Sequence, residues 1–192
     1  MKKIEIIWRD VLEEASKNPA FEQKKLAIKY GFSTSTVFAA INPLRQMGAI
    51  EVTSRNFKVI NFEKILMYWA THRNLMRDLI YSTYVDMPVM EIEGLVDNKT
   101  IYGCYSALRL RLKSAPSEYD KVYFYTLDPT ALKLRFPKVK HAPNIFILKA
   151  DPYLLKYGKT TPPSQTFVDL WNLKDWYADE FLKALKEKYY AP

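Results

Sequence analysis

Short polar side chains between residues 33 and 42 have the types and the spacing that can read the edges of base pairs. Hydroxyl and amide groups donate and accept hydrogen bonds, so a helix that presents several of them along one side can address the major groove of DNA. The candidates for such contacts are Ser33, Thr34, Ser35, Thr36 and Asn42, with Phe38 pointing outward beside them. The chemistry that these residue types predict is recognition of a nucleic acid.

The residues from Glu22 to Met47 predict the two helices and the sharp turn that such a reader requires. Apolar or small side chains recur at the spacing of a helix-turn-helix at Leu26, Ala27, Tyr30, Phe32, Val37 and Ala40. Gly31 can adopt the positive φ that turns the chain between the helices, and Ser33 can cap the second helix. An ordinary pair of packed helices has the same apolar spacings and is the alternative.

Two alternating runs follow and predict a β-hairpin, the wing of a winged helix. Gly48 ends the second helix, residues 49–53 and 57–60 alternate, and residues 54–56 form a polar turn between them. Basic and amide side chains around this hairpin are expected to contact phosphate or a minor groove, namely Arg45, Arg55, Asn56 and Lys58. Pro43 removes one helical hydrogen bond and is expected to kink the last turn.

Composition sets broad limits on the protein. The chain has 192 residues, is 48% hydrophobic and carries a net charge of +8, so it can bury a core and suits a polyanionic partner. Its one cysteine, Cys104, excludes an internal disulfide. With no signal peptide and no apolar stretch near the length of a membrane span, we expect a cytoplasmic protein without a membrane partner.

The remaining patterns predict the α+β class, with an N-terminal winged helix-turn-helix (residues 1–60) and a mixed helix/strand C-terminal domain (residues 61–192). Helical spacing predicts a first helix over 3–17 and a long helix from Asn61 through Ile80, then helices near 88–96 and from Thr100 to Leu112. Continuous apolar runs predict buried strands at 122–125 and 145–148. A helix opened by Asp128 and Pro129 lies between the strands, and two more helices follow residue 163.

Basic residues cluster between residues 99 and 140, which hold 9 Lys and Arg against 3 Asp and Glu. The cluster includes Arg109, Arg111, Lys113, Lys133, Arg135, Lys138 and Lys140. One interpretation is a solvated face, and the other is a second basic surface that binds flanking DNA or an acidic partner protein. If the cluster is a binding surface, its basic residues at 109–113 and those at 133–140 converge on one side of the C-terminal domain.

Residues that would carry catalysis are sparse, so we expect neither an enzyme nor a cofactor or metal site. His72 and His141 lack a second ligand at metal spacing, and Cys104 lies in an apolar helix. Asp120, Asp128 and Asp151 flank the two apolar strands as nuclease carboxylates do. However, Lys149 lacks the acid two residues earlier that such a site needs. Aromatic-rich segments can form a ligand pocket, although core packing is the commoner use of such spacing.

Several segments resemble the AbiEi-type antitoxins of abortive-infection systems. The resemblance combines the winged helix-turn-helix with the 102–108 helix (YGCYSAL), the strands at 122–125 and 145–148, and the 163–170 segment (PSQTFVDL). It implies that the N-terminal domain represses its own promoter while the C-terminal domain neutralises a nucleotidyltransferase-type toxin. The chain departs from the family pattern at 171–176, where WNLKDW replaces a turn containing glycine and arginine.

Together these patterns favour a sequence-specific DNA-binding transcriptional repressor that is antitoxin-like. Its expected partners are double-stranded DNA and a cognate toxin protein. The alternative is a freestanding ligand-sensing winged-helix transcription factor without a toxin, and a more remote one is a nucleic-acid-processing enzyme. The operator sequence, any effector and the oligomeric state do not follow from the sequence.

Overall fold

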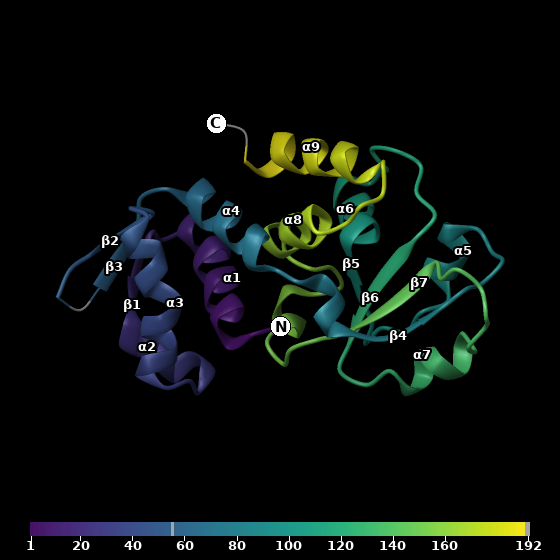
Figure 1. The fold of residues 1–192 in the computed structure, drawn as a ribbon, viewed down its shortest axis with the longest axis horizontal. Coiled ribbons are helices and arrows are strands. Elements are labelled where there is room, and N and C mark those ends of the chain that lie inside the picture. The colour runs from purple at the N-terminus through teal and green to yellow at the C-terminus, as the bar shows by residue number, and fades with distance from the viewer. Residues whose placement is uncertain (55, 191–192) are drawn as a thin grey trace. The chain divides into compact units, whose positions relative to one another are not determined.

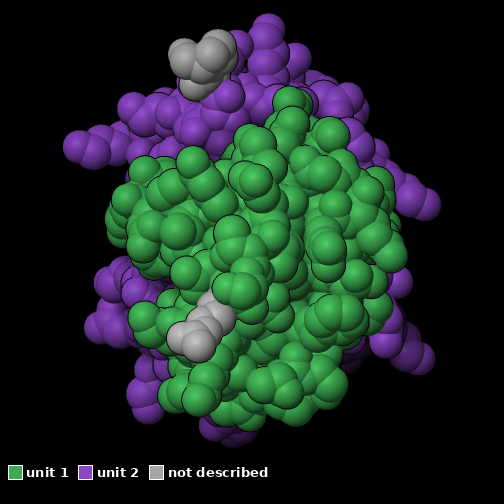
Figure 2. All heavy atoms as spheres, turned by 90° about the vertical axis from the view of Figure 1, so that its left-hand side faces the viewer, with its two compact units in different colours: residues 1–73 green, residues 74–192 purple. Residues whose placement is uncertain are grey.

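The chain folds into two compact units of the α+β class. The computed structural model describes residues 1–54 and 56–190. The two units are Met1–Arg73 (unit 1) and Asn74–Pro192 (unit 2), which Figure 2 shows in separate colours; Figure 1 shows the ribbon. The division differs from the expected one after residue 60, because the helix that follows the hairpin packs within unit 1.

Unit 1 is built on four helices whose apolar faces meet in one core. They are α1 (Lys3–Ala15), α2 (Gln23–Tyr30), α3 (Thr34–Gln46) and α4 (Phe62–His72). The buried indole of Trp8 donates a hydrogen bond of 2.8 Å to the carbonyl oxygen of Ala40, which ties α1 to α3. Trp69 in α4 donates through its indole N–H to a carboxylate oxygen of Glu5 at 3.2 Å. These contacts make α1 the centre of the unit.

A three-stranded antiparallel sheet completes unit 1. Its strands are β1 (Ala20–Glu22), β2 (Ile50–Val52) and β3 (Asn56–Val59), in the order β1-β3-β2. The hairpin of β2 and β3 was predicted, whereas β1 was not. Three residues are too few to show alternation, and β1 is defined by its pairing with β3, where Phe21 lies opposite Phe57 with ring centroids 5.2 Å apart.

Unit 2 contains a mixed four-stranded sheet. Its strands are β4 (Leu79–Thr83), β5 (Ile101–Gly103), β6 (Val122–Thr126) and β7 (Ile145–Lys149), in the order β4-β7-β6-β5. The central pair β6 and β7 is parallel, and each outer strand is antiparallel to its neighbour. Every residue of β6 is buried, as the continuous apolar run predicted.

Helices cover both faces of this sheet. One face carries Val122 and Phe124 and packs against α5 (Val89–Gly94) and α7 (Thr130–Arg135). The other face carries Tyr123 and Tyr125 and is covered by α6 and α8, on which α9 packs (Figure 1). These three helices span Cys104–Leu112, Pro163–Trp171 and Ala178–Tyr189. In the described residues, no helix is both long enough and apolar enough to cross a membrane.

Two helix predictions for residues 61–112 were wrong. Asn61 does cap α4, accepting a hydrogen bond from the backbone N–H of Lys64 at 2.9 Å. The helix ends at His72, however, and Leu79 and Ile80 belong to β4. Thr100 does not start a helix either, because residues 101–103 form β5 before α6 begins. Both strands pair with partners far along the chain, so their local apolar spacing was misleading.

Candidate nucleic-acid interface

Glycines in the left-handed conformation end both α2 and α3. Gly31 has a φ of 59°, and the next residue, Phe32, donates its N–H to the carbonyl oxygen of Ala27 at 3.0 Å. Gly48 has a φ of 67°, and Ala49 donates in the same way to Leu44 at 2.9 Å. Such a hydrogen bond pairs a backbone carbonyl oxygen that has no partner within the helix, and the left-handed glycine turns the chain sharply. The turn after α2 is what points α3 away from it.

The buried side of α3 is apolar, and its opposite side presents a mixed row of side chains. Val37, Ala40, Ile41 and Leu44 are buried in the core of unit 1. Helical spacing places five residues on the opposite side, which we call the outer face of α3: Ser35, Phe38, Ala39, Asn42 and Gln46. Phe38 is 58% exposed, which is unusual for so large an apolar side chain.

Two members of the outer face, Ala39 and Gln46, were absent from the residues selected by sequence reasoning. Both are exposed. The signal that identifies them is helical spacing, because Ala39 lies four residues after Ser35 and Gln46 lies four residues after Asn42. The capacity of side chains to form hydrogen bonds instead favoured the serines and threonines at the start of α3.

Three of these hydroxyl side chains form a cluster at the N-terminal cap of α3. Ser33 accepts a hydrogen bond from the N–H of Thr36 at 3.2 Å, as predicted for the cap. The hydroxyl oxygen of Ser33 also lies 2.9 Å from those of Ser35 and Thr36. Thr36 is half-buried and lies off the outer face, whereas Thr34 is exposed at the first turn. The cluster therefore stabilises the start of α3, and Ser35 alone of the three also faces outward.

The β2–β3 hairpin presents a less basic surface than expected. Lys58 is exposed, but its backbone lies directly opposite Glu51, so a carboxylate shares that face of the sheet. Asn56 closes the turn by accepting hydrogen bonds from Thr53 through its backbone oxygen. Arg45 is exposed near the end of α3. The predicted contact of Arg55 lies outside the described residues.

The surface of unit 1 keeps the excess of positive charge that its composition gives. The unit holds 12 Lys and Arg against 7 Asp and Glu. Two of the acids are buried and paired, Glu5 with Arg73 at 3.4 Å and Asp10 with Lys29 at 2.8 Å. Arg9 and Arg73 are buried as well, so burial removes two carboxylates and two cations from the surface. The remaining exposed excess of positive charge favours an anionic partner.

The predicted second basic surface is divided between the two faces of the unit 2 sheet. The α6 group covers the face of Tyr123 and Tyr125, and the α7 group follows the helix on the opposite face. The two groups consist of Arg109, Arg111 and Lys113, and of Lys133, Arg135, Lys138 and Lys140. Convergence on one side was therefore wrong, because the parallel strands β6 and β7 place α7 across the sheet from α6.

Two of the three cations in the α6 group are engaged in structural contacts. Arg109 pairs with buried Glu93 and also donates to the hydroxyl of Tyr119 at 3.0 Å. Burial would lower the pKa of Arg109, but the carboxylate of Glu93 outweighs it and raises that pKa. Arg111 donates two hydrogen bonds to the carbonyl oxygen of Thr161, at 3.0 and 3.2 Å. Lys113 is exposed.

The α7 group is the more exposed of the two. All four of its cations are exposed, and Lys133 and Lys138 both lie over the ring of Tyr81, 5.6 and 5.4 Å from its centroid. Lys138 also donates to the carbonyl oxygen of Ser82. These contacts hold two of the ammonium groups beside β4, while Arg135 and Lys140 extend the positive surface.

Comparisons with protein-family models, curated proteins and solved structures found no match for this chain. Within the described residues, no three His, Cys, Asp or Glu side chains lie close enough to hold a metal ion. The 163–170 segment that carried much of the family resemblance forms most of α8. Its residues from Ser164 to Leu170 are all buried, and Asp169 accepts a hydrogen bond of 2.6 Å from the hydroxyl of Tyr125.

Proposed function

We propose that this protein is a sequence-specific DNA-binding transcriptional repressor and that unit 1 is a winged helix-turn-helix. The observation that carries the proposal is the outer face of α3. It holds two amides, a hydroxyl and an exposed aromatic ring on a helix that a left-handed glycine turns away from its predecessor. The order of three helices followed by a β-hairpin fits the same class.

In this proposal, α3 enters the major groove and its outer face contacts base edges. The amide of Asn42 can both accept from and donate to adenine, and the ring of Phe38 can pack on a thymine methyl group. Lys58 and Arg45 contact the phosphate backbone on either side, which sets the register without reading sequence. Glu51 limits how closely the hairpin approaches phosphate.

Selection from a pool of random DNA duplexes tests the proposal directly. The full-length protein should enrich a common sequence, and gel-shift titration of the selected duplex should give an affinity at least about a thousandfold above that for random DNA. Asn42→Ala should reduce this difference in affinity, because it should weaken binding to the selected duplex and leave binding to random DNA unchanged. If no sequence is enriched, or if Asn42→Ala weakens both duplexes equally, the proposed reading of bases by α3 is wrong.

For unit 2, the resemblance to AbiEi-type antitoxins supports a role in neutralising a toxin. Because α8 is buried, the segment that carries this resemblance supports the core, and a toxin would have to contact exposed groups elsewhere. Co-expression with the neighbouring gene product is the test. A neighbouring product that is toxic alone and harmless together with this protein supports the role. A product that is harmless alone contradicts it and leaves DNA binding unaffected.

A specific observation favours the second candidate function, a freestanding regulator that senses a ligand. Unit 2 contains a pocket of about 510 Å³, within the range of small-molecule sites. A regulator that acts through such a pocket needs no toxin partner. The chemistry of the pocket defines which ligand it would sense.

A further inference from the structure

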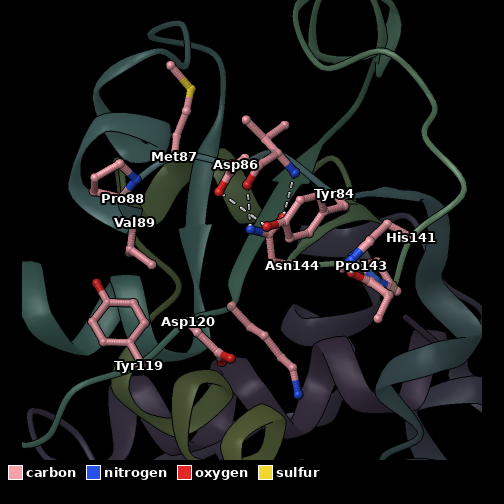
Figure 3. A pocket seen from close by; sticks show the side chains of 13 residues that line it. Tyr84, Asp86, Met87, Pro88, Val89, Tyr119, Asp120, His141, Pro143 and Asn144 are labelled. Atoms are coloured by element: carbon pink, nitrogen blue, oxygen red, sulfur yellow. Dashed lines mark hydrogen bonds between the residues drawn. The ribbon is translucent and has the colours of Figure 1, made fainter.

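The pocket lies at one end of the unit 2 sheet, where three loops meet (Figure 3). Residues 84–89 lead from β4 to α5, residues 119–121 precede β6, and residues 141–144 precede β7. All of its lining residues belong to unit 2. This inference therefore does not rest on DNA binding by unit 1.

The walls of the pocket are held in place by contacts with residues of the same unit. The rings of Tyr84 and His141 lie 4.1 Å apart between centroids. The side-chain amide of Asn144 accepts from the N–H of Val85 at 3.0 Å and donates to its carbonyl oxygen at 2.8 Å. Tyr119 donates to Glu93 at 2.7 Å. A pocket preformed in this way loses little conformational freedom when it binds a ligand.

Two carboxylates give the pocket a negative character. Asp86 accepts a hydrogen bond from Tyr84 at 3.3 Å, and Asp120 accepts one from Tyr177 at 2.5 Å. Each bond uses the Oδ1 atom. Within the described part of the chain, the second oxygen of each carboxylate is therefore left for a ligand. The charge of Asp86 also raises the pKa of Tyr84.

The one lysine of the lining does not offset this charge. Lys121 forms an ion pair with Asp175, which lies outside the lining. The charge of this lysine is thus already paired, while Asp86 and Asp120 interact with neutral tyrosines. A phosphate or carboxylate ligand would meet uncompensated negative charge, whereas a cation would complete the balance.

We propose that this pocket binds a small organic cation, an amine that carries an aromatic or apolar body. The ammonium group lies between Asp86 and Asp120, and the body packs against the rings of Tyr84, Tyr119 and His141. In Figure 3, Tyr119 lies on one side of the two carboxylates and the Tyr84–His141 pair on the other. Aromatic faces attract cations as well as apolar groups, so walls and charges select the same ligand class. Met87, Pro88 and Val89 add an apolar rim.

Calorimetric titration of the full-length protein with three matched probes tests the charge preference. Tyramine carries a positive charge, tyrosol is its neutral alcohol analogue, and 4-hydroxyphenylacetate is its anionic analogue. Tyramine should bind with a dissociation constant on the order of 1 mM or below, as its size allows. Tyrosol should bind at least about fivefold more weakly. Absence of tyramine binding, or equal binding of tyramine and the anion, would overturn the proposal.

Two isosteric variants test the assignment of residues. Asp86→Asn and Asp120→Asn keep a side-chain oxygen for Tyr84 and Tyr177 but remove the charge. Each should weaken tyramine about threefold to tenfold and leave tyrosol unchanged. Asp179→Asn, an exposed carboxylate on α9 outside the pocket, is the matched control and should bind like wild type. Wild-type tyramine affinity in both pocket variants, with folding confirmed by circular dichroism, would show that the carboxylates do not recognise the amine.

Discussion

Single side chains on unit 1 divide into those that face outward from α3 and those that hold the helix in place. Phe38 belongs to the first group and Ser33 to the second. Polar side chains at the start of α3 contribute to its cap, so hydrogen-bonding capacity alone does not identify a base contact. Phe38 is 58% exposed and takes no part in this cap. Its presence on the outer face is therefore the more informative observation about DNA recognition.

Phe38 provides a test of thymine recognition at the level of one methyl group. If its ring packs on a thymine methyl, replacing that thymine with uracil in the selected duplex should weaken binding about fourfold, the value of one buried methyl group. The Phe38→Ala variant should lose this discrimination. Gel-shift titration of both proteins on both duplexes gives the coupling energy. Equal losses on uracil substitution for wild type and variant would exclude this contact.

Lys58 and Glu51 make opposite predictions for the same face of the hairpin. Lys58→Ala should weaken binding to all duplexes and lower the slope of log affinity against log salt by about 0.9, because one fewer counterion is released. Glu51→Gln should strengthen binding about twofold at low salt, since it removes a charge that repels phosphate. Lys183→Ala on α9 is the control. If Lys58→Ala leaves the salt slope unchanged, Lys58 does not contact phosphate and the hairpin is not part of the proposed DNA interface.

At the scale of elements, backbone conformation at helix ends decides where α2 and α3 point. Gly31 and Gly48 have positive φ values, and no atom lies within 4 Å of where a Cβ would be placed at either glycine. The requirement for glycine is therefore conformational and does not arise from crowding. A substitution there tests the turn itself, since it removes no contact.

Gly31→Ala should lower the free energy of unfolding by roughly 1–2 kcal/mol, the cost of the left-handed conformation with a Cβ. Gly94→Ala is the matched control, because Gly94 lies in α5, has no positive φ and also has open space around it. That change should stabilise the protein by about 0.5–1 kcal/mol. Urea unfolding measures both. Similar effects from the two substitutions would contradict the role of the turn.

The tyrosines packed on α6, β6 and α9 predict sensitivity to alkali. Burial raises the pKa of Tyr105, Tyr119, Tyr123 and Tyr177 above the ordinary value of about 10, with smaller contributions from nearby acids. The unfolded chain releases these protons from about pH 10 upward while the folded chain retains them. Stability should thus be complete below pH 10 and decrease above it, by up to about 1.4 kcal/mol per pH unit for each tyrosine.

Urea unfolding at a series of pH values from about 9 to about 11 measures this decrease. Tyr123→Phe removes one titrating group and should make the decrease less steep. Tyr189→Phe, at an exposed position near the end of α9, should leave the slope as in wild type. A stability that stays constant across this range would contradict the burial of these hydroxyl groups.

At the scale of the whole molecule, the division between the units determines which fragments can fold. Ile65, Leu66 and Trp69 of α4 are buried, and Arg73 pairs with Glu5 of α1. Burial of three such side chains contributes about 1.5–3 kcal/mol each, which is comparable with the entire stability of a small domain.

A fragment of residues 1–73 should therefore unfold cooperatively on heating, whereas a fragment of residues 1–60 should not. Circular dichroism at increasing temperature distinguishes them. Replacing Trp69 with Ala in the longer fragment should lower its midpoint strongly, while Lys64→Ala, an exposed change on the same helix, should have a small effect. Cooperative unfolding of the 1–60 fragment would show that the N-terminal domain ends at residue 60, as expected from the sequence.

Local patterns in the sequence determined most of unit 1 and the centre of unit 2. Helical spacing predicted α1, α2 and α3, and side-chain chemistry predicted the caps at Ser33 and Asn61. The two continuous apolar runs predicted β6 and β7. These features depend on residues within one or two turns or along one strand, so the information is present in a short stretch of sequence.

Only the tertiary structure decided the outer strands, the faces of the sheet and the pocket. β1, β4 and β5 exist because of partners distant in the sequence, and their own residues do not distinguish strand from helix or loop. The cations of the α6 and α7 groups belong to one basic stretch of the sequence, but they lie on opposite faces of the sheet. Asp86, Asp120 and His141 meet because the ends of three strands meet. Strand pairing joins segments that no local pattern connects.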